Sequence, residues 1–124
     1  MHTVKIAVVD DDDLVRATVC ELVRVACPGA EVVDYVSSAY VLHEIETSTV
    51  DLLITNCQMP DMDGPSLVRK LRELKHSLPI IMISASNGAQ ELGEAAGIDR
   101  FVPKNLLYPG LVEAIHALLP KTVD

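Results

Sequence analysis

The sequence predicts a single α/β domain in which five strands alternate with five helices along 124 residues. Short apolar runs rich in Val, Ile and Leu recur along the chain, and most are followed by a stretch with apolar residues at helical spacing. The breaks between these segments are short turns marked by Gly, Pro and Asn rather than long polar tracts. With 49% apolar residues, a chain of this length can bury one core.

The first strand–helix unit begins with the apolar run at residues 4–9, which is typical of a strand buried on both faces. Four aspartates follow, and Asp13 is the expected N-cap of the next helix because acidic residues suit a helix N-terminus. Pro28 and Gly29 end that helix. Its inward face is predicted to consist of Val15, Val19, Leu22 and Ala26.

The second unit begins with a strand at residues 31–36. Ser37 and Ser38 are expected to cap the helix that follows it, because short hydroxyl side chains are favoured at a helix start. The same helix is expected to direct Leu42 and Ile45 into the core.

The third unit has its strand at residues 51–55, directly before Asn56. Pro65 suits the first turn of the third helix, where its missing N–H would have no partner in any case. The buried stripe of this helix is predicted to consist of Leu67, Val68, Leu71 and Leu74.

The last two units differ in the strength of their helix patterns. The fourth strand, residues 79–83, ends at Ser84, and the fifth, residues 100–103, ends at Lys104. Between them, residues 85–97 give only a weak helical stripe of Leu92, Ala95 and Ala96. The final helix has a clear inward face of Leu111, Val112, Ile115, Leu118 and Leu119, and Pro120 is expected to end it.

Five consecutive strand–helix units with right-handed crossovers place their helices on both faces of a parallel sheet. The arrangement that fits best is a doubly wound, flavodoxin-like sheet with the strand order 2-1-3-4-5. In such a sheet the carboxyl ends of all strands lie along one edge, where ligands usually bind.

Composition narrows the class of protein. The net charge of −8 argues against direct binding to nucleic acid or to a membrane surface, since both require clustered Lys and Arg. No apolar run is long enough for a transmembrane helix, and residues 1–5 lead straight into the first strand without a signal peptide. Three cysteines without metal-ligand spacing are expected to be reduced thiols. We therefore expect a cytoplasmic domain.

Polar side chains stand at the ends of four predicted strands. They are Asp10 and Asp11, Asn56, Ser84 and Lys104. Two adjacent carboxylates are unfavourable unless a cation joins them, and oxygen ligands of this kind suit Mg²⁺. A hydroxyl and an ammonium group could then hold an oxyanion such as a phosphoryl group on the metal. The competing interpretations are a solvated acidic helix start at Asp10 and Asp11, and a turn-capping amide at Asn56.

Four stretches together resemble the receiver domains of response regulators in two-component signalling. They are Val-Val-Asp-Asp at residues 8–11, Met-Pro-Asp-Met-Asp-Gly at 59–64, Pro-Ile-Ile-Met-Ile-Ser-Ala at 79–85, and Phe-Val-Pro-Lys at 101–104. The resemblance covers the whole chain, so residues 1–124 are expected to form one receiver domain. An effector domain beyond residue 124 remains open.

The resemblance implies a role for each site residue. Asp11 would bind Mg²⁺ directly, Asp10 would assist through water, and the backbone carbonyl of Gln58 would be a further ligand. Ser84 would be the switch hydroxyl, Phe101 the switch aromatic, and Lys104 the phosphoryl-binding lysine. Position 56, here Asn56, would be a further metal ligand and would accept a phosphoryl group from a sensor histidine kinase or phosphotransfer protein. The chain would then act as a signalling module and not as an enzyme.

Three departures from the family pattern bear on function. The acceptor position holds Asn56 in place of aspartate, and an amide is a far poorer nucleophile than a carboxylate. Asn105 stands where the family usually has a proline, often after a cis bond; a cis bond before a non-proline residue costs about 3 kcal/mol, so that loop should be rebuilt. The segment of residues 84–97 is also a little short for the family.

Three functions remain in competition. The chain is a receiver whose acceptor aspartate has been replaced, or a natural pseudo-receiver that binds partners without phosphorylation, or an enzyme on the same fold such as an aspartyl-phosphate phosphatase or a flavin protein. The absence of a strand-end nucleophile and of a glycine-rich phosphate loop argues against the enzyme. In a receiver, the fourth helix, fifth strand and fifth helix would form the surface for an output partner or a homodimer.

Overall fold

The computed structural model describes residues 2–119 and has the architecture that the sequence predicts. Its elements are β1 (Lys5–Val9), α1 (Asp13–Ala26), β2 (Glu31–Tyr35), α2 (Ser38–Thr47), β3 (Leu52–Asn56), α3 (Gly64–Glu73), β4 (Ile80–Ser84), α4 (Ala89–Ala96), β5 (Arg100–Pro103), a 3-10 turn (Lys104–Leu106) and α5 (Leu107–Leu118). The strands form one parallel sheet in the order β2-β1-β3-β4-β5. The predicted flavodoxin-like order is confirmed.

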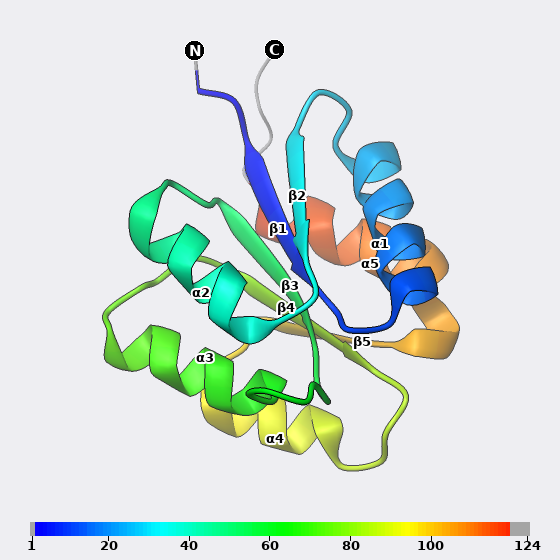
Figure 1. Ribbon diagram of the computed structural model, residues 1–124. Coiled ribbons are helices and arrows are strands. Elements are labelled where there is room, and N and C mark those ends of the chain that lie inside the picture. Colours follow the sequence, from blue (N-terminus) through cyan, green and yellow to red (C-terminus); the bar gives the residue numbers. More distant parts are fainter. Residues whose placement is uncertain (1, 120–124) are drawn as a thin grey trace.

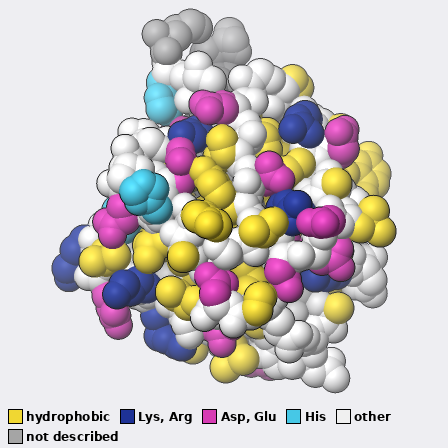
Figure 2. Space-filling model, viewed as in Figure 1, with side chains coloured by type: hydrophobic (Ala, Val, Ile, Leu, Met, Phe, Trp, Pro, Cys, Tyr) yellow, Lys and Arg dark blue, Asp and Glu magenta, His cyan; other side chains and the backbone are white. Residues whose placement is uncertain are grey.

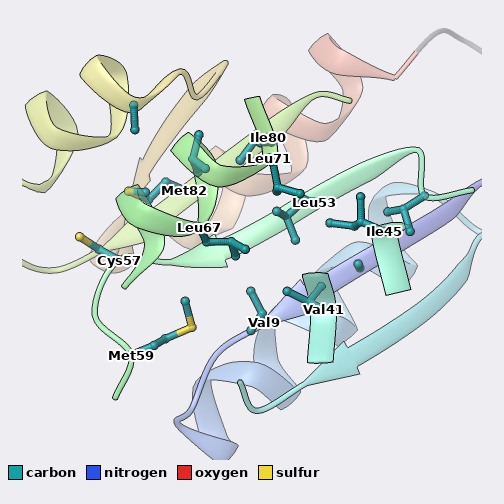
Figure 3. Packing of buried hydrophobic residues seen from close by; sticks show 14 of the residues in the cluster. Val9, Val41, Ile45, Leu53, Cys57, Met59, Leu67, Leu71, Ile80 and Met82 are labelled. Carbon is teal, nitrogen blue, oxygen red and sulfur yellow. The ribbon is translucent and has the colours of Figure 1, made fainter. Parts of the chain in front are cut away.

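The helices cover the sheet on both sides. In Figure 1, α1 and α5 lie side by side on one face of the sheet, and α2, α3 and α4 form a row along the other. Each face has its own core because successive strand residues point to opposite sides. On β3, Leu53 packs beneath α2 and α3 (Figure 3), whereas Leu52 and Ile54 pack towards α1 and α5. All three side chains are fully buried, as continuous apolar strands predict.

Helix α1 begins one residue earlier than its expected cap would place it. Asp12, not Asp13, is the N-cap, and its Oδ1 accepts hydrogen bonds from the N–H groups of Leu14 and Val15. Asp13 is exposed and pairs with Arg16 instead. The buried residues of the helix are Val19, Cys20, Val23 and Ala26. The predicted inward residues Val15 and Leu22 are only half-buried.

Helix α3 matches its prediction except at its C-terminal end. Asp63 is the N-cap and accepts from the N–H of Ser66, and Pro65 lies in the first turn as expected. Leu67, Val68 and Leu71 are fully buried. Leu74 was expected in the same stripe but is 43% exposed, because the helix ends there and Leu74 is its C-cap.

Helix α4 packs on the sheet through small residues rather than through its leucine. Its buried residues are Ala89, Gly93 and Ala96, while Leu92 is 56% exposed. A Cβ atom at Gly93 would lie 2.8 Å from Ile98 Cδ1 and 2.9 Å from Met82 Sδ. The predicted inward placement of Leu92 and Ala95 is therefore wrong, because the close approach at Gly93 rotates both outward.

The chain after β5 follows a local path of its own. Lys104 begins the 3-10 turn, and α5 starts with a kink at Tyr108, where φ is −116° and ψ is 124°. The single cis peptide bond among residues 2–119 joins Tyr108 to Pro109, and none precedes Asn105. The inward face of α5 is confirmed at Leu111 and Ile115. Pro120, the expected end of α5, lies outside the described residues.

None of the helices in the described part of the chain is long and apolar enough to cross a membrane. On the face shown in Figure 2, acidic side chains are interspersed with hydrophobic and basic ones.

Candidate functional site

The strand register brings the predicted site residues to one edge of the sheet. Asn56 is the last residue of β3 and pairs with Ile83, next to Ser84 at the end of β4. Ser84 in turn pairs with Pro103, and Lys104 follows directly. Asp10 follows Val9 at the end of β1, beside β3. The convergence expected from a parallel sheet is therefore present.

Asp10 is the buried acid of this edge. Its side chain is fully buried; Oδ1 accepts a hydrogen bond from the N–H of Asp12 at 2.9 Å, while Oδ2 has no hydrogen-bond partner. Burial raises the pKa of this carboxyl above its usual value, although the Asp12 N–H and the Lys104 charge oppose the shift. Lys104 Nζ lies 3.9 Å from Oδ2, too far for a hydrogen bond. A buried oxygen in this state calls for a cation or a further donor.

Two of the four consecutive aspartates are engaged in structural contacts, and the other two remain free to bind a ligand. Asp12 caps α1, and Asp13 pairs with Arg16 on the surface. Arg16 also donates to the carbonyl of Asp10 at 2.9 Å and so fixes the backbone at the end of β1. Asp11 is exposed at the site edge. Only Asp10 and Asp11 are left to act on a ligand.

Asn56 is 6% exposed and makes a turn-type hydrogen bond within its own loop. Its Nδ2 donates to the carbonyl oxygen of Gln58 at 2.7 Å. The interpretation of Asn56 as a turn-capping amide is therefore confirmed. Gly64 packs against the backbone of the same residue, since a Cβ atom there would lie 2.3 Å from the Asn56 carbonyl oxygen.

The loop after β3 is tied to α2 by a contact that the sequence did not predict. The carboxylate of Asp61 accepts from the N–H groups of Ser38 and Ala39 at 3.3 and 3.1 Å. Ser38 Oγ is buried and donates to the carbonyl of Met62 at 2.6 Å. Ser37 occupies the N-cap position, but its side chain makes no capping hydrogen bond. No local signal could reveal this cap, because Asp61 is distant from α2 in the sequence.

Ser84 and Phe101, the predicted switch pair, line the same cavity. Ser84 is buried and its Oγ accepts from the N–H of Ser86 at 3.0 Å. Phe101 is half-buried. The cavity has a volume of about 380 Å³ and also has Asn105 in its wall. The structure therefore places the two predicted switch residues in the wall of one cavity.

The donors at this edge fit a hard divalent cation. Within residues 2–119, no group of three or more His, Cys, Asp or Glu side chains is placed to hold a metal ion. Mg²⁺ needs fewer, because it usually takes one or two carboxylates and keeps several waters. The unpartnered Oδ2 of Asp10 and the exposed carboxylate of Asp11 match that requirement.

Comparisons with known proteins bear on the family and the fold. The model of the response regulator receiver domain matches residues 6–116. Response regulator MprA of Mycobacterium bovis is 31% identical over 129 residues, covering 97% of this chain and 52% of that protein. Transcriptional regulatory protein PrrA of Mycobacterium tuberculosis is 31% identical over 117 residues, covering 93% and 49%. The chain spans about half the length of the curated relatives it matches.

Solved structures show the same fold. A putative response regulator from Chloroflexus aurantiacus superposes with a TM-score of 0.85 at 28% identity, covering 94% of this chain and 98% of that one. The chemotaxis protein CheY4 of Vibrio cholerae superposes with a TM-score of 0.83 at 24% identity, covering 95% and 100%, which bears on the fold alone. The family match and the sheet order agree, and the chain belongs to the response regulator receiver domain family of two-component signal transduction.

Proposed function

We propose that this receiver domain belongs to a two-component phosphorelay in which position 56 is the phosphoryl acceptor. We further propose that Asn56 prevents phosphorylation of this chain. The observation that carries the proposal is the buried amide of Asn56 at the same sheet edge as Asp10, Ser84 and Lys104. A buried, incompletely partnered carboxylate is destabilising, so its presence favours a retained role in binding.

The acceptor chemistry requires a carboxylate at position 56. Its oxygen would attack the phosphorus of a phosphodonor, forming an O–P bond while the donor bond breaks and the leaving group takes its electron pair. Mg²⁺, which receiver domains generally use, would neutralise phosphoryl charge, and Asp10, Asp11 and the Gln58 carbonyl would hold it. The neutral amide of Asn56 is a poor nucleophile and gives no stable phosphoryl adduct.

The remaining residues have roles in binding and switching. Lys104 would pair with a phosphoryl oxygen, because its ammonium already lies at the mouth of the site, 3.9 Å from Asp10. Ser84 would move towards that oxygen, and Phe101 would then enter the cavity that both residues line. The resulting change would reshape the α4–β5–α5 surface, where an output protein or a second copy of the chain would bind.

Response regulators interact with histidine kinases and effector domains, and the same classes of partner are proposed here. The acidic net charge argues against direct contact between this domain and DNA, so we propose that any such contact is made by a linked effector domain. The alignment to only about half of MprA leaves room for such a domain. We further propose a cytoplasmic location for the domain, where its three cysteines would stay reduced.

The test is Asn56→Asp with acetyl phosphate and Mg²⁺. We expect the variant to gain the mass of one phosphoryl group, labile to hydroxylamine as an acyl phosphate is, while the chain as written gains none. Asn56→Asp combined with Lys104→Ala is the matched control and should accept phosphate more slowly. A variant with Asp at position 56 that stays unmodified would refute the acceptor assignment.

A second candidate is a pseudo-receiver that binds its partner without phosphorylation. It is favoured by the eight-residue α4 and by Asn105, since both belong to the part of the fold that reports switching. This candidate predicts equal partner affinity for the chain as written and for Asn56→Asp, with or without acetyl phosphate. A large phosphate-dependent gain in affinity in the variant would exclude it.

A further inference from the structure

The hydrogen bond from Asn56 to Gln58 has a consequence for the metal. Asn56 Nδ2 donates to the Gln58 carbonyl oxygen at 2.7 Å, and the Asn56 side chain is 6% exposed. Water therefore competes little for this donor. The oxygen it engages is the same backbone carbonyl that the proposed function assigns to Mg²⁺.

A carboxylate at position 56 could not make this contact. An ionised aspartate only accepts hydrogen bonds, so it would leave the Gln58 carbonyl free for a cation. The amide of Asn56 carries two N–H donors, and one of them takes the place of a cation at the Gln58 carbonyl oxygen. In the chain as written, the carbonyl is satisfied by a side chain two residues away.

We infer that Asn56 closes the metal site by engaging the Gln58 carbonyl, so that Mg²⁺ binding must first break a hydrogen bond within the loop. The inference rests on the proposed function for its assignment of position 56 and Gln58. It goes beyond the loss of one negative charge, because the amide acts as a competitor of the metal and not merely as a weaker ligand.

The alternative, in which the Asn56 amide is a ligand of Mg²⁺, predicts the opposite change in Mg²⁺ affinity when the side chain is removed. If the amide oxygen of Asn56 helped to hold Mg²⁺, removing the side chain would weaken binding. If the amide competes with Mg²⁺, removing it strengthens binding, although no charge has been added. Asn56→Ala and Asn56→Leu both remove the donor, and Leu keeps the branched shape of the buried side chain.

The experiment titrates Mg²⁺ alone, without a phosphodonor, into each variant and measures affinity by calorimetry and by amide chemical shifts at Asp11. We expect Asn56→Ala and Asn56→Leu to bind about threefold to tenfold more tightly than the chain as written, the factor that corresponds to a net hydrogen bond of about 0.7–1.4 kcal/mol. Gln90→Ala is the control and should not change the affinity, because Gln90 is exposed on α4 and its side chain bonds only Glu94. Asp11→Ala should weaken binding in every background.

A second measurement follows the side-chain amide of Asn56 itself. Its two N–H resonances should shift as Mg²⁺ saturates the chain as written, because the hydrogen bond to Gln58 opens. Circular dichroism establishes that each variant is folded, and the leucine variant carries the test if the alanine variant is not. Equal or weaker Mg²⁺ affinity in the folded variants overturns the inference. That outcome is independent of whether Asn56→Asp accepts phosphate, so the two proposals fail separately.

Discussion

Replacing Asp61 by alanine should loosen α2 while leaving α3 intact. The carboxylate of Asp61 is the cap of α2, through bonds of 3.3 and 3.1 Å from the N–H groups of Ser38 and Ala39. Burial raises the pKa of Asp61, but these backbone hydrogen bonds outweigh that effect and lower the pKa below its usual value. The carboxylate is therefore ionised at neutral pH and favours the helix N-terminus.

The expected loss of stability is about 1 kcal/mol. Removing an N-cap side chain typically costs about 0.5–2 kcal/mol. The two hydrogen bonds are longer than the ideal, and Asp61 is exposed, so the loss belongs in the middle of that range. The Ser38–Met62 hydrogen bond remains in the variant and keeps the loop against α2.

The assay combines urea unfolding with amide hydrogen exchange. Asp61→Ala should lower the unfolding midpoint without changing the m-value, and should speed exchange at Ser38 and Ala39. Asp63→Ala is the matched control, because Asp63 caps α3 at Ser66 in the same loop. It should speed exchange at Ser66 and leave α2 protected. Unchanged exchange at Ser38 and Ala39 in the Asp61 variant would refute the cap.

Three further predictions concern the buried acid, the packing of the loop and the pH dependence. Asp10→Asn should raise the free energy of unfolding by about 1 kcal/mol, because it removes a buried charge whose Oδ2 has no hydrogen-bond partner. A lower thermal unfolding midpoint in the variant would contradict this. Gly64→Ala should cost about 1–3 kcal/mol in urea unfolding, since the added Cβ would lie 2.3 Å from the Asn56 carbonyl oxygen, and a neutral result would disprove the close contact. Hydrogen bonds from Lys5, Ser48 and Tyr35 hold the pKa of Glu44 at about 2, below its usual 4.5. Because the pKa of Glu44 is lower in the folded state than in the unfolded state, this stabilisation is complete above pH 4.5 and is lost as the pH falls towards 2. Glu44→Gln should therefore reduce the pH dependence of the free energy of unfolding between pH 4.5 and 2. An identical pH profile in the variant would count against the hydrogen-bond network.

The sheet and the positions of its strand ends followed from the sequence because their physical signal is local. A parallel strand buried on both faces must be nearly continuous in apolar residues, and β3 and β4 are so. The polar residue that ends such a run then lies at the carboxyl edge, as Asn56 and Ser84 do. Once the strand order was inferred, the convergence of Asp10 and Lys104 followed from the parallel register.

The features that the sequence did not reveal depend on contacts between distant segments. The cap of α2 comes from Asp61, and nothing near Ser37 indicates it. The outward direction of Leu92 is set by the contact of Gly93 with Met82 and Ile98, which overrides the hydrophobic pattern of the helix. Asp12 displaced Asp13 as the cap of α1 by a single residue, which is within the usual uncertainty of helix ends.

Helix α4 contacts the sheet through Ala89, Gly93 and Ala96. The residues that hold this helix on the sheet are therefore different from those that it presents at the surface. The inward side has no large side chain to interlock with the core, so the contact depends on the smallness of three residues. The outward side, which includes the exposed Leu92, makes no demand on the core and is free to change during evolution. Substitutions among the outward residues of α4 can therefore change the surface that this helix presents without disturbing its contact with the sheet.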